Sequence, residues 1–278
     1  DQRWGFFPSL SAGWRISSEP FFSENISFID YMKLRGSIAT LGNDAIGGWQ
    51  WMARYGITTG AVFNGLSYGV EPKEVPNPKL TWEKSTSYNI GFDSRWFNNK
   101  LDFSFEYFYR RTYDILDNLT VSVPTTFGAS LPKENYSEVK SRGFEVELGY
   151  NDRIGKLDYY FRGNFSFANS WWSKKDEAEN IRPYKSEIGQ SLGREWGFEC
   201  IGMIRTEEQL KQYMEENPNM TIKGQKPGLG MLIYKDVRGP ESDEPDGIIT
   251  DDDKVVIIEK KVAPITYGFT IGGKWNGF

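Results

Sequence analysis

The segment KLDFSFEYFYRR (100–111) decides the fold, because apolar and polar side chains alternate along it almost without exception. The apolar positions, mostly aromatic, are Leu101, Phe103, Phe105, Tyr107 and Tyr109. The polar positions between them are Asp102, Ser104, Glu106 and Arg110, and Phe108 alone breaks the pattern. Successive side chains of a strand point to opposite faces, so the segment is predicted to be a β-strand with one apolar and one hydrated face.

The same alternation recurs along the chain and predicts seven long strands in total. The other six lie at residues 9–16, 32–39, 85–96, 143–150, 157–169 and 265–275. Short turns are predicted at 97–100 and 151–156, and long irregular connections at 41–80, 113–140 and 171–262. Short and long connections alternate, as in an up-and-down antiparallel sheet with its tight turns at one end.

The alternation fits either lipid or a protein core as the partner of the apolar face. The strands have the length needed to cross a bilayer, about 9–11 tilted residues. Tryptophans stand near strand ends, as in the aromatic belts of membrane proteins, at Trp82, Trp96, Trp171, Trp172 and Trp275. A soluble sheet with one wet face gives the same pattern. The predicted fold is all-β: a segment of an antiparallel up-and-down transmembrane β-barrel with long extracellular loops.

Composition excludes several kinds of function. The 278 residues carry a net charge of −5 and no basic block, so nucleic acid is not an expected partner. Histidine is absent, which removes Ser-His-Asp catalysis and the common zinc motifs. Cys200 is the single cysteine, so no intrachain disulfide forms. No signal peptide precedes the first strand, and an exported protein is therefore expected to be a mature piece or a fragment.

Residues 206–217 (TEEQLKQYMEEN) switch to helical spacing. Thr206 is the expected N-cap, Gln209 completes a capping box, and Asn217-Pro218 ends the helix. The apolar stripe formed by Leu210, Tyr213 and Met214 is expected to pack on its own loop rather than on a partner.

Carboxylates offer the remaining routes to chemistry. Glu145 and Glu147 share a strand face about 6.8 Å apart, a separation found in glycosidases, although any carboxylates two residues apart on a strand have it. The expected role of Glu106, Glu145, Glu147 and Arg162 is to line a hydrated lumen.

The acidic stretch 236–257 is the best candidate for calcium. The predicted ligands are Asp236, Asp243, Asp246, the Ile248 carbonyl, Thr250 and Asp253. The alternative is a solvated acidic turn without a metal. No other cofactor is expected.

Several stretches resemble the SusC/RagA-type TonB-dependent outer-membrane transporters of Bacteroidetes. They are FFPSLSAGWRISSEPFF (6–22), LRGSIATLGND (34–44), NPKLTWEKSTSYNIGFD (77–93), YRRTYDIL (109–116), SVPTTFGASLPKENYSEVKSRGFEVELGY (122–150), YKDVRG (234–239) and APITYGFTIGGKW (263–275). The resemblance implies the later part of a roughly 22-stranded plugged barrel, with residues 1–278 as a partial barrel domain that lacks the plug and the terminal strand. Seven strands cannot close such a barrel.

What this family does supplies the expected function and partners. Its members import oligosaccharides or peptides across the cell outer membrane beneath a SusD-like lipoprotein lid, driven by TonB–ExbB–ExbD, and outer-membrane lipid surrounds the barrel. The family commonly has an uninterrupted D-x-N-G-D-G run where GPESDEP (239–245) stands here. In the loop at 47–69, the aromatic residues expected to contact cargo or lid are Trp49, Trp51, Tyr55, Phe63 and Tyr68; packing within the loop is the alternative. A soluble β-sheet glycan-binding module and a carboxylate glycosidase are the competing functions.

Overall fold

The structure is a computed structural model that describes residues 4–44, 51–62, 65–119 and 131–276. The chain divides into two compact units, Asp1–Ser191 with Pro264–Phe278, and Leu192–Ala263. No helix in the described ranges is long and apolar enough to span a bilayer.

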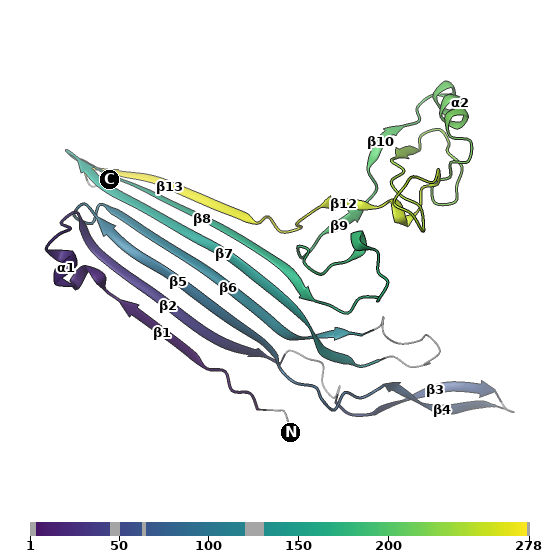
Figure 1. The fold of residues 1–278 in the computed structure, drawn as a ribbon, viewed down its shortest axis with the longest axis horizontal. Coiled ribbons are helices and arrows are strands. Elements are labelled where there is room, and N and C mark those ends of the chain that lie inside the picture. The colour runs from purple at the N-terminus through teal and green to yellow at the C-terminus, as the bar shows by residue number, and fades with distance from the viewer. Residues whose placement is uncertain (1–3, 45–50, 63–64, 120–130, 277–278) are drawn as a thin grey trace. The chain divides into compact units, whose positions relative to one another are not determined.

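The first unit is built on one antiparallel sheet of seven strands (Figure 1). In spatial order they are β1 (Ser9–Trp14), β2 (Ile29–Asn43), β5 (Glu83–Trp96), β6 (Leu101–Asn118), β7 (Lys133–Ile154), β8 (Leu157–Lys174) and β13 (Ile265–Trp275). These are the seven strands predicted from the alternation, and each pairs with the next one along the chain within the sheet. The up-and-down arrangement is confirmed.

Two tight turns join strands at the same end of the sheet, which we call the turn end; the other is the loop end. The turn between β5 and β6 places Phe97, Asn98 and Asn99 at positive φ. The turn between β7 and β8 has Gly155 at φ 60°. Asparagine and glycine tolerate this left-handed region better than most residues, which explains the predicted turns at 97–100 and 151–156.

Several strands run well beyond the alternation that revealed them. β7 has 22 residues and begins at Lys133, ten residues before the predicted start. β6 continues to Asn118, so strands take up both ends of the connection that the sequence predicted to be irregular at 113–140. Pairing continues there although the apolar positions no longer alternate, since Ile115 and Leu116 are adjacent in β6 and Tyr136 and Val139 are three residues apart in β7.

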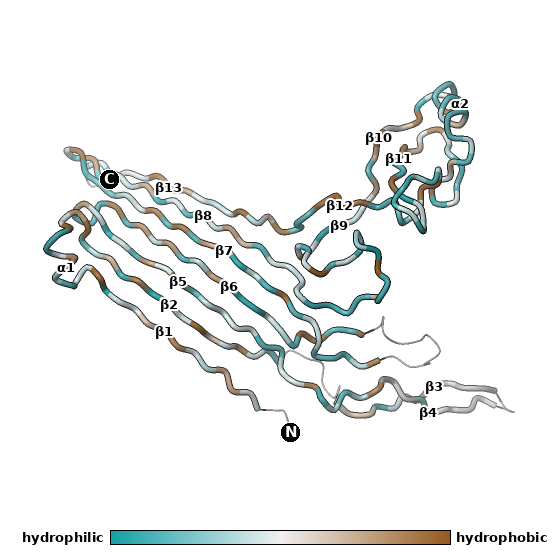
Figure 2. The backbone as a smooth tube through the Cα atoms, in the orientation of Figure 1, coloured by the Kyte–Doolittle hydropathy of each residue, from teal (hydrophilic) through white to brown (hydrophobic). Residues whose placement is uncertain are grey.

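The pairing register sorts the side chains into rows that cross the whole sheet. One row is entirely apolar: Trp14, Leu34, Phe92, Phe105, Val146, Phe165 and Tyr267. The next row faces the other side: Gly13, Arg35, Gly91, Glu106, Glu145, Ser166 and Thr266. Figure 2 shows the resulting alternation of hydrophobic and hydrophilic positions along the strands.

The apolar face of the sheet has no protein layer over it in the described residues. Ile90, on the central strand β5, is 65% exposed and Tyr88 is 49% exposed. The one buried hydrophobic side chain among the described residues of this unit is Phe22, which lies in the short helix α1 (Pro20–Ser23) rather than in the sheet. This sheet therefore has no conventional hydrophobic core.

Two residues that break the pattern have local explanations. Phe108 faces the polar side opposite Gly143, where an added Cβ would lie 2.6 Å from the Phe108 ring and 2.1 Å from the Phe167 carbonyl oxygen. The ring thus fills the space over the glycine. Ser94 lies on the apolar face, but it is buried, accepts a hydrogen bond from Trp96 Nε1 and donates one to the Phe103 carbonyl.

The connections within this unit contain short elements. η1 (Ile16–Ser18) and α1 join β1 to β2, and η3 (Pro183–Lys185) follows β8. β3 (Arg54–Val62) and β4 (Leu66–Glu74) form a separate antiparallel hairpin. The prediction that 41–80 is irregular is therefore wrong for these residues, where threonine and glycine dilute the apolar alternation.

The unit Leu192–Ala263 has a small conventional core. Its elements are β9 (Glu195–Gly197), β10 (Cys200–Met203), α2 (Glu207–Glu216), β11 (Leu232–Tyr234), η4 (Asp251–Asp253) and β12 (Val255–Ile258). β10 pairs with β11, and β12 pairs with β9. Met220, Ile222 and Ile249 are buried together, with Phe198, Tyr213, Met231 and Tyr234 packed around them. The sequence predicted a long irregular loop with one helix here, so the compact unit was missed.

Helix α2 has the predicted N-cap and C-terminal end, but the Gln209 side chain accepts from the residue before the N-cap and not from the Thr206 N–H of the predicted capping box. Thr206 Oγ1 accepts a hydrogen bond from the Gln209 backbone N–H at 3.3 Å, and Gln209 Oε1 accepts one from the Arg205 N–H at 2.9 Å. Asn217 is the C-cap. Tyr213 packs against the core of its own unit, which confirms the expected packing of the helix on its own loop.

Candidate functional site: the polar face of the sheet

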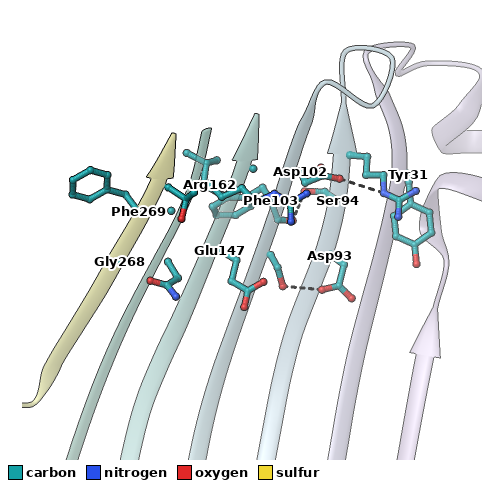
Figure 3. Close-up of a pocket in the computed structure, with 16 residues that line it drawn as sticks. Tyr31, Asp93, Ser94, Asp102, Phe103, Glu147, Arg162, Gly268 and Phe269 are labelled. Atoms are coloured by element: carbon teal, nitrogen blue, oxygen red, sulfur yellow. Dashed lines mark hydrogen bonds and ion pairs between the residues drawn. The ribbon is translucent and has the colours of Figure 1, made fainter. Parts of the chain in front are cut away.

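The polar face of the sheet is hollowed near the turn end (Figure 3). The hollow has a volume of about 730 Å³ and is crossed by β2, β5, β6, β7, β8 and β13. Its charged lining residues are Asp93, Arg95, Asp102, Glu147 and Arg162. Charges of both signs therefore face the same space, which suits a hydrated surface that hydrogen-bonds polar solutes.

Arg35 is the centre of the largest ion-pair network on this face. Its Nε lies 3.3 Å from Asp93 Oδ2 on the neighbouring strand. Its Nη1 donates to the carboxylate of Glu106, two strands away. Asn89 Nδ2 donates to the other Glu106 oxygen at 3.0 Å, so both oxygens of that carboxylate have partners.

Gly91 makes this reach possible. It lies between Arg35 and Glu106 in the same cross-strand row. A Cβ at Gly91 would lie 2.5 Å from the Phe105 carbonyl oxygen and 3.4 Å from the Arg35 guanidinium carbon. The arginine side chain can cross β5 at this row because the intervening residue has no side chain.

A second set of polar contacts lies closer to the turns. Arg95 Nε is 3.3 Å from Asp102 Oδ1, and its guanidinium lies 5.4 Å from the centre of the Tyr31 ring. Ser104 Oγ donates to Asp93 Oδ1 at 2.8 Å. These contacts fix the carboxylates of Asp93 and Asp102 on the wall of the hollow, as Figure 3 shows.

The four residues predicted to line a lumen share this face. Glu106 and Glu145 are direct cross-strand partners, and Glu147 and Arg162 line the hollow. Like charges opposite one another destabilise a sheet, and Arg35 offsets that repulsion by neutralising Glu106. Glu145 and Glu147 are exposed, and no described group holds them as an acid and a base around a common point.

The alternation placed Arg35, Asn89 and Asp93 on the polar faces of their strands, but the predicted site residues included none of them and not Gly91. The signal was available, because Arg35 and Asp93 occupy polar positions of strands whose apolar face was recognised. Applying the face assignment to every strand would have found the charged residues. The role of Gly91 depends on the register between strands, which the sequence did not supply.

The predicted loop aromatics are only partly described. Trp49 and Phe63 lie outside the described residues, and Trp51 is exposed. Tyr55 and Tyr68 are exposed on the hairpin β3–β4, and pairing puts them on one face with two residues the sequence analysis did not single out, Ile57 and Val70. Ile57 is 80% exposed, so this hairpin face presents a continuous apolar strip.

In the acidic segment of the second unit, carboxylates accept hydrogen bonds from backbone N–H groups. Asp253 is fully buried. Its Oδ1 accepts hydrogen bonds from the backbone N–H groups of Val237 and Arg238 at 2.8 and 3.0 Å. Its Oδ2 accepts one from the Thr250 N–H at 2.7 Å. Asp236 accepts from the Gly247 N–H at 2.6 Å, and burial raises the pKa of its carboxyl above the ordinary value.

The other predicted calcium ligands are spread around the same turn. Asp246 accepts from the Ile248 N–H at 2.9 Å, Thr250 caps η4, and Asp243 is exposed. In the described part of the chain, no three His, Cys, Asp or Glu side chains gather as a metal site. Calcium binding stays a prediction, and the observed contacts give Asp236 and Asp253 a structural role.

Comparisons with known proteins place this geometry in context. A sequence profile described as the β-barrel of TonB-dependent receptor-like proteins matches residues 1–197. TonB-dependent receptor P39 of Formosa agariphila is 31% identical over 208 residues, which make up 74% of this chain and 20% of that protein. TonB-dependent receptor SusC of Bacteroides thetaiotaomicron is 27% identical over 175 residues, 62% of this chain and 17% of that protein.

Among solved structures, the RagAB peptide importer in its open-open state superimposes with a TM-score of 0.72 at 22% identity. The match covers 98% of this chain and 27% of that chain. At this identity the likeness concerns the fold, and it confirms the predicted all-β antiparallel barrel architecture. The chain spans about a quarter or less of the length of each of these proteins.

Proposed function

Because the chain belongs to the family of TonB-dependent receptor-like β-barrels, we propose that it forms part of the wall of an outer-membrane transporter that imports a nutrient. The resemblance seen in the sequence is thereby confirmed, and proteins of this family reside in the outer membrane. One observation carries the proposal: an apolar row of exposed and half-buried side chains crosses all seven strands without a described protein layer over it, while the opposite face carries ion pairs. Such a sheet suits lipid on one side and water on the other.

The soluble glycan-binding module is the weaker alternative. A soluble sheet of this size would bury its apolar face against a second layer, and the described residues supply none. The exposed apolar rows would then form a patch far larger than monomeric soluble proteins usually carry.

Transport rather than covalent chemistry is the proposed role of the polar face. Glu145, Glu147 and Arg162 point to the proposed lumen, where they would serve as fixed charges on a hydrated channel wall. We assign none of these residues a catalytic step.

The proposed partners act at opposite ends of the barrel. A SusD-like surface lipoprotein covers the loop end, and TonB–ExbB–ExbD drives import through a plug domain of the transporter. SusC and the RagAB importer motivate both assignments. The cargo class is an oligosaccharide or a peptide.

The apolar strip on the β3–β4 hairpin is the proposed contact with lid or cargo. Tyr55, Ile57, Tyr68 and Val70 are exposed together on one hairpin face, and aromatic rings suit both sugar stacking and protein interfaces. Trp51 precedes the hairpin and belongs to the same proposed surface, as do Trp49 and Phe63 from the sequence prediction.

The function is tested with the full-length transporter and its lipoprotein in the native outer membrane. Tyr55→Ala with Tyr68→Ala is expected to lower uptake of labelled oligosaccharides or peptides, or co-purification of the lipoprotein, at least several-fold. Thr58→Ala, on the opposite hairpin face, is the matched control and should leave both unchanged.

Two outcomes would count against different parts of the proposal. Recovery of the full-length protein from cells without detergent would remove the membrane assignment. Normal uptake and lid binding in the double variant, with normal barrel assembly, would remove only the role of the hairpin face. Comparison of the two labelled cargo classes decides between sugar and peptide.

A further inference from the structure

The outward face of the sheet changes character just above the apolar band. At the loop end, the row of Ile38, Tyr88 and Tyr109 is the last one with aromatic residues on both central strands, β5 and β6. Four cations lie at this edge: Arg142 on β7 stands in the same row as Tyr109, Arg111 on β6 and Lys140 on β7 form the next row outward, and Lys84 on β5 lies one row further. We call these four residues the outer basic cluster.

Register puts these cations on the same face as the apolar rows. Arg142 is the direct cross-strand partner of Tyr109, and Arg111 is the partner of both Thr86 and Lys140. The pairing is continuous from Arg111 down to Leu101, so no bulge turns the cluster toward the lumen. Arg110, the neighbour of Arg111, faces the lumen and donates to Ser87 Oγ.

The cluster carries more positive charge than its protein partners neutralise. Arg111 Nε donates to Glu138 Oε2 at 2.8 Å, and Lys140 Nζ lies 3.6 Å from the other oxygen of that carboxylate. Lys84 Nζ lies 3.0 Å from Asp114. Arg142 has no carboxylate partner in the described structure. Two carboxylates thus serve four cations: Glu138 bridges Arg111 and Lys140, which lie directly opposite one another, and Asp114 contacts Lys84, so the positive charge of Arg142 is the one without a carboxylate among the described residues.

Aromatic rings hold two of the guanidinium groups beside the band. The Arg142 guanidinium carbon lies 5.5 Å from the Trp171 ring centre, and that of Arg111 lies 4.9 Å from the Tyr113 ring centre. A ring contact of this kind orients the planar guanidinium. Arg111 donates from its Nε and Nη2 to Glu138, whereas no carboxylate among the described residues accepts from Arg142. The turn end differs: there the outward-facing Asp152 is paired with Lys100 at 2.8 Å.

We propose that the outer basic cluster binds the phosphate of a lipid headgroup in the bilayer leaflet at the loop end. The cluster begins in the last aromatic row of the apolar band and extends outward from it, at the depth where headgroups lie. Arginine and lysine side chains gathered at this depth recognise anionic headgroups, and guanidinium groups match phosphate oxygens in pairs. The acyl chains would lie along the apolar rows below. The inference rests on the membrane assignment but is independent of cargo import.

The probe is phosphatidic acid, compared with diacylglycerol of identical acyl chains, which lacks only the phosphate. The full-length transporter in detergent micelles is titrated with each lipid, and bound lipid is counted by native mass spectrometry. We expect phosphatidic acid to bind to the transporter and diacylglycerol not to bind. Inorganic phosphate is added in a separate arm, and displacement of the lipid by an equal concentration of it would identify a free-ion site and overturn the proposal.

Two variants measure the contribution of the cluster. Arg142→Gln is expected to weaken phosphatidic acid binding about fivefold, and Arg142→Gln with Lys140→Gln about thirtyfold, at roughly one fivefold step per cation at a membrane surface. Arg110→Gln removes a cation at the same height on the lumen face and should leave lipid binding unchanged. The single Arg142→Gln change breaks no described ion pair, so it keeps the test valid if the double variant assembles poorly.

Equal binding of both lipids, or equal loss in Arg110→Gln and Arg142→Gln, would overturn the proposal. Uptake measured on the same variants separates this inference from the transport function. Lost lipid binding with normal import would leave both conclusions standing, whereas unchanged lipid binding in all variants would remove only the headgroup site.

Discussion

The seven-stranded sheet and the unit Leu192–Ala263 use apolar residues in opposite ways. On the sheet, Ile90, Tyr88 and their neighbours are exposed on a surface with no protein cover. In the second unit, Ile249 is 0% exposed and lies at the centre of a small core. The two regions belong to one polypeptide, so the difference reflects the solvent each is built for. On the proposed membrane assignment, lipid takes the place of a core in the first region, and water drives the packing of a core in the second.

The distribution of charge follows the same division. The sheet keeps its ion pairs on the face opposite the apolar rows, where Arg35 connects Asp93 and Glu106 across three strands. The second unit turns a charge inward at Asp253, and three backbone N–H groups compensate its burial. Substitutions in the sheet and in the second unit test this contrast separately.

Ile90→Arg is expected to have the largest effect. It places a cation on the central lipid-facing row, where a charge costs about 2–4 kcal/mol near the bilayer midplane. Urea unfolding of the full-length barrel in lipid vesicles measures the loss. Ser37→Arg, at an exposed position of the polar face on the neighbouring strand β2, is the matched control and should change stability by less than about 1 kcal/mol. Equal losses in both variants would contradict the assignment of the faces.

Asp253→Asn tests the inward charge of the second unit. The amide keeps one acceptor oxygen and places an NH₂ donor against backbone donors, which leaves buried N–H groups unpaired at a cost of about 1–3 kcal/mol. Limited proteolysis of the full-length protein should then cut within 192–263 while the barrel stays intact. If added calcium protects the wild-type segment from proteolysis and a chelator reverses the protection, the result would support calcium binding by this segment.

Gly91→Ala tests the route of Arg35 over the sheet. The new methyl group would meet the Phe105 carbonyl oxygen at 2.5 Å, so the backbone must shift, at a cost of about 1–3 kcal/mol for overpacking. Gly149→Ala lies on the same face, and its Cβ would meet Asp102 at an ordinary 3.5 Å. The two variants are compared by unfolding in vesicles, and a larger loss at Gly149 would refute the bridging role of Arg35.

Asp251→Asn should have the smallest effect. Its carboxylate is exposed and contacts Lys254 and Lys223, which lower its pKa below the ordinary 3.8. The folded unit therefore keeps this group ionised to lower pH than the unfolded chain, and the stabilisation is lost as the pH falls from 3.8 through the folded pKa. Wild-type resistance to an acid-active protease should fall slightly more over this range than that of the variant. Identical profiles would show that the pairs contribute nothing measurable.

The alternation in the sequence predicted the seven strands and their faces because residues 88–96 or 101–109 meet two solvents at once. It failed in the first ten residues of β7, where pairing continues although the few apolar side chains do not alternate and the buried residues, Ser137 and Glu138, are polar. The hairpin β3–β4 and the core around Ile249 were missed for related reasons. Glycine and threonine weaken the pattern in the hairpin, and the core residues of the second unit come from segments far apart in the chain.

Period-two patterning was enough to identify a two-faced antiparallel sheet and its order of strands, since side-chain direction in a strand depends only on position along it. Partnerships across the sheet were beyond that pattern. Register brought Arg35 over Gly91 to Glu106, and it set four cations beside the aromatic edge of the apolar band. These contacts join residues tens of positions apart, and the alignment of one strand against the next depends on the packing and hydrogen bonding of the assembled sheet.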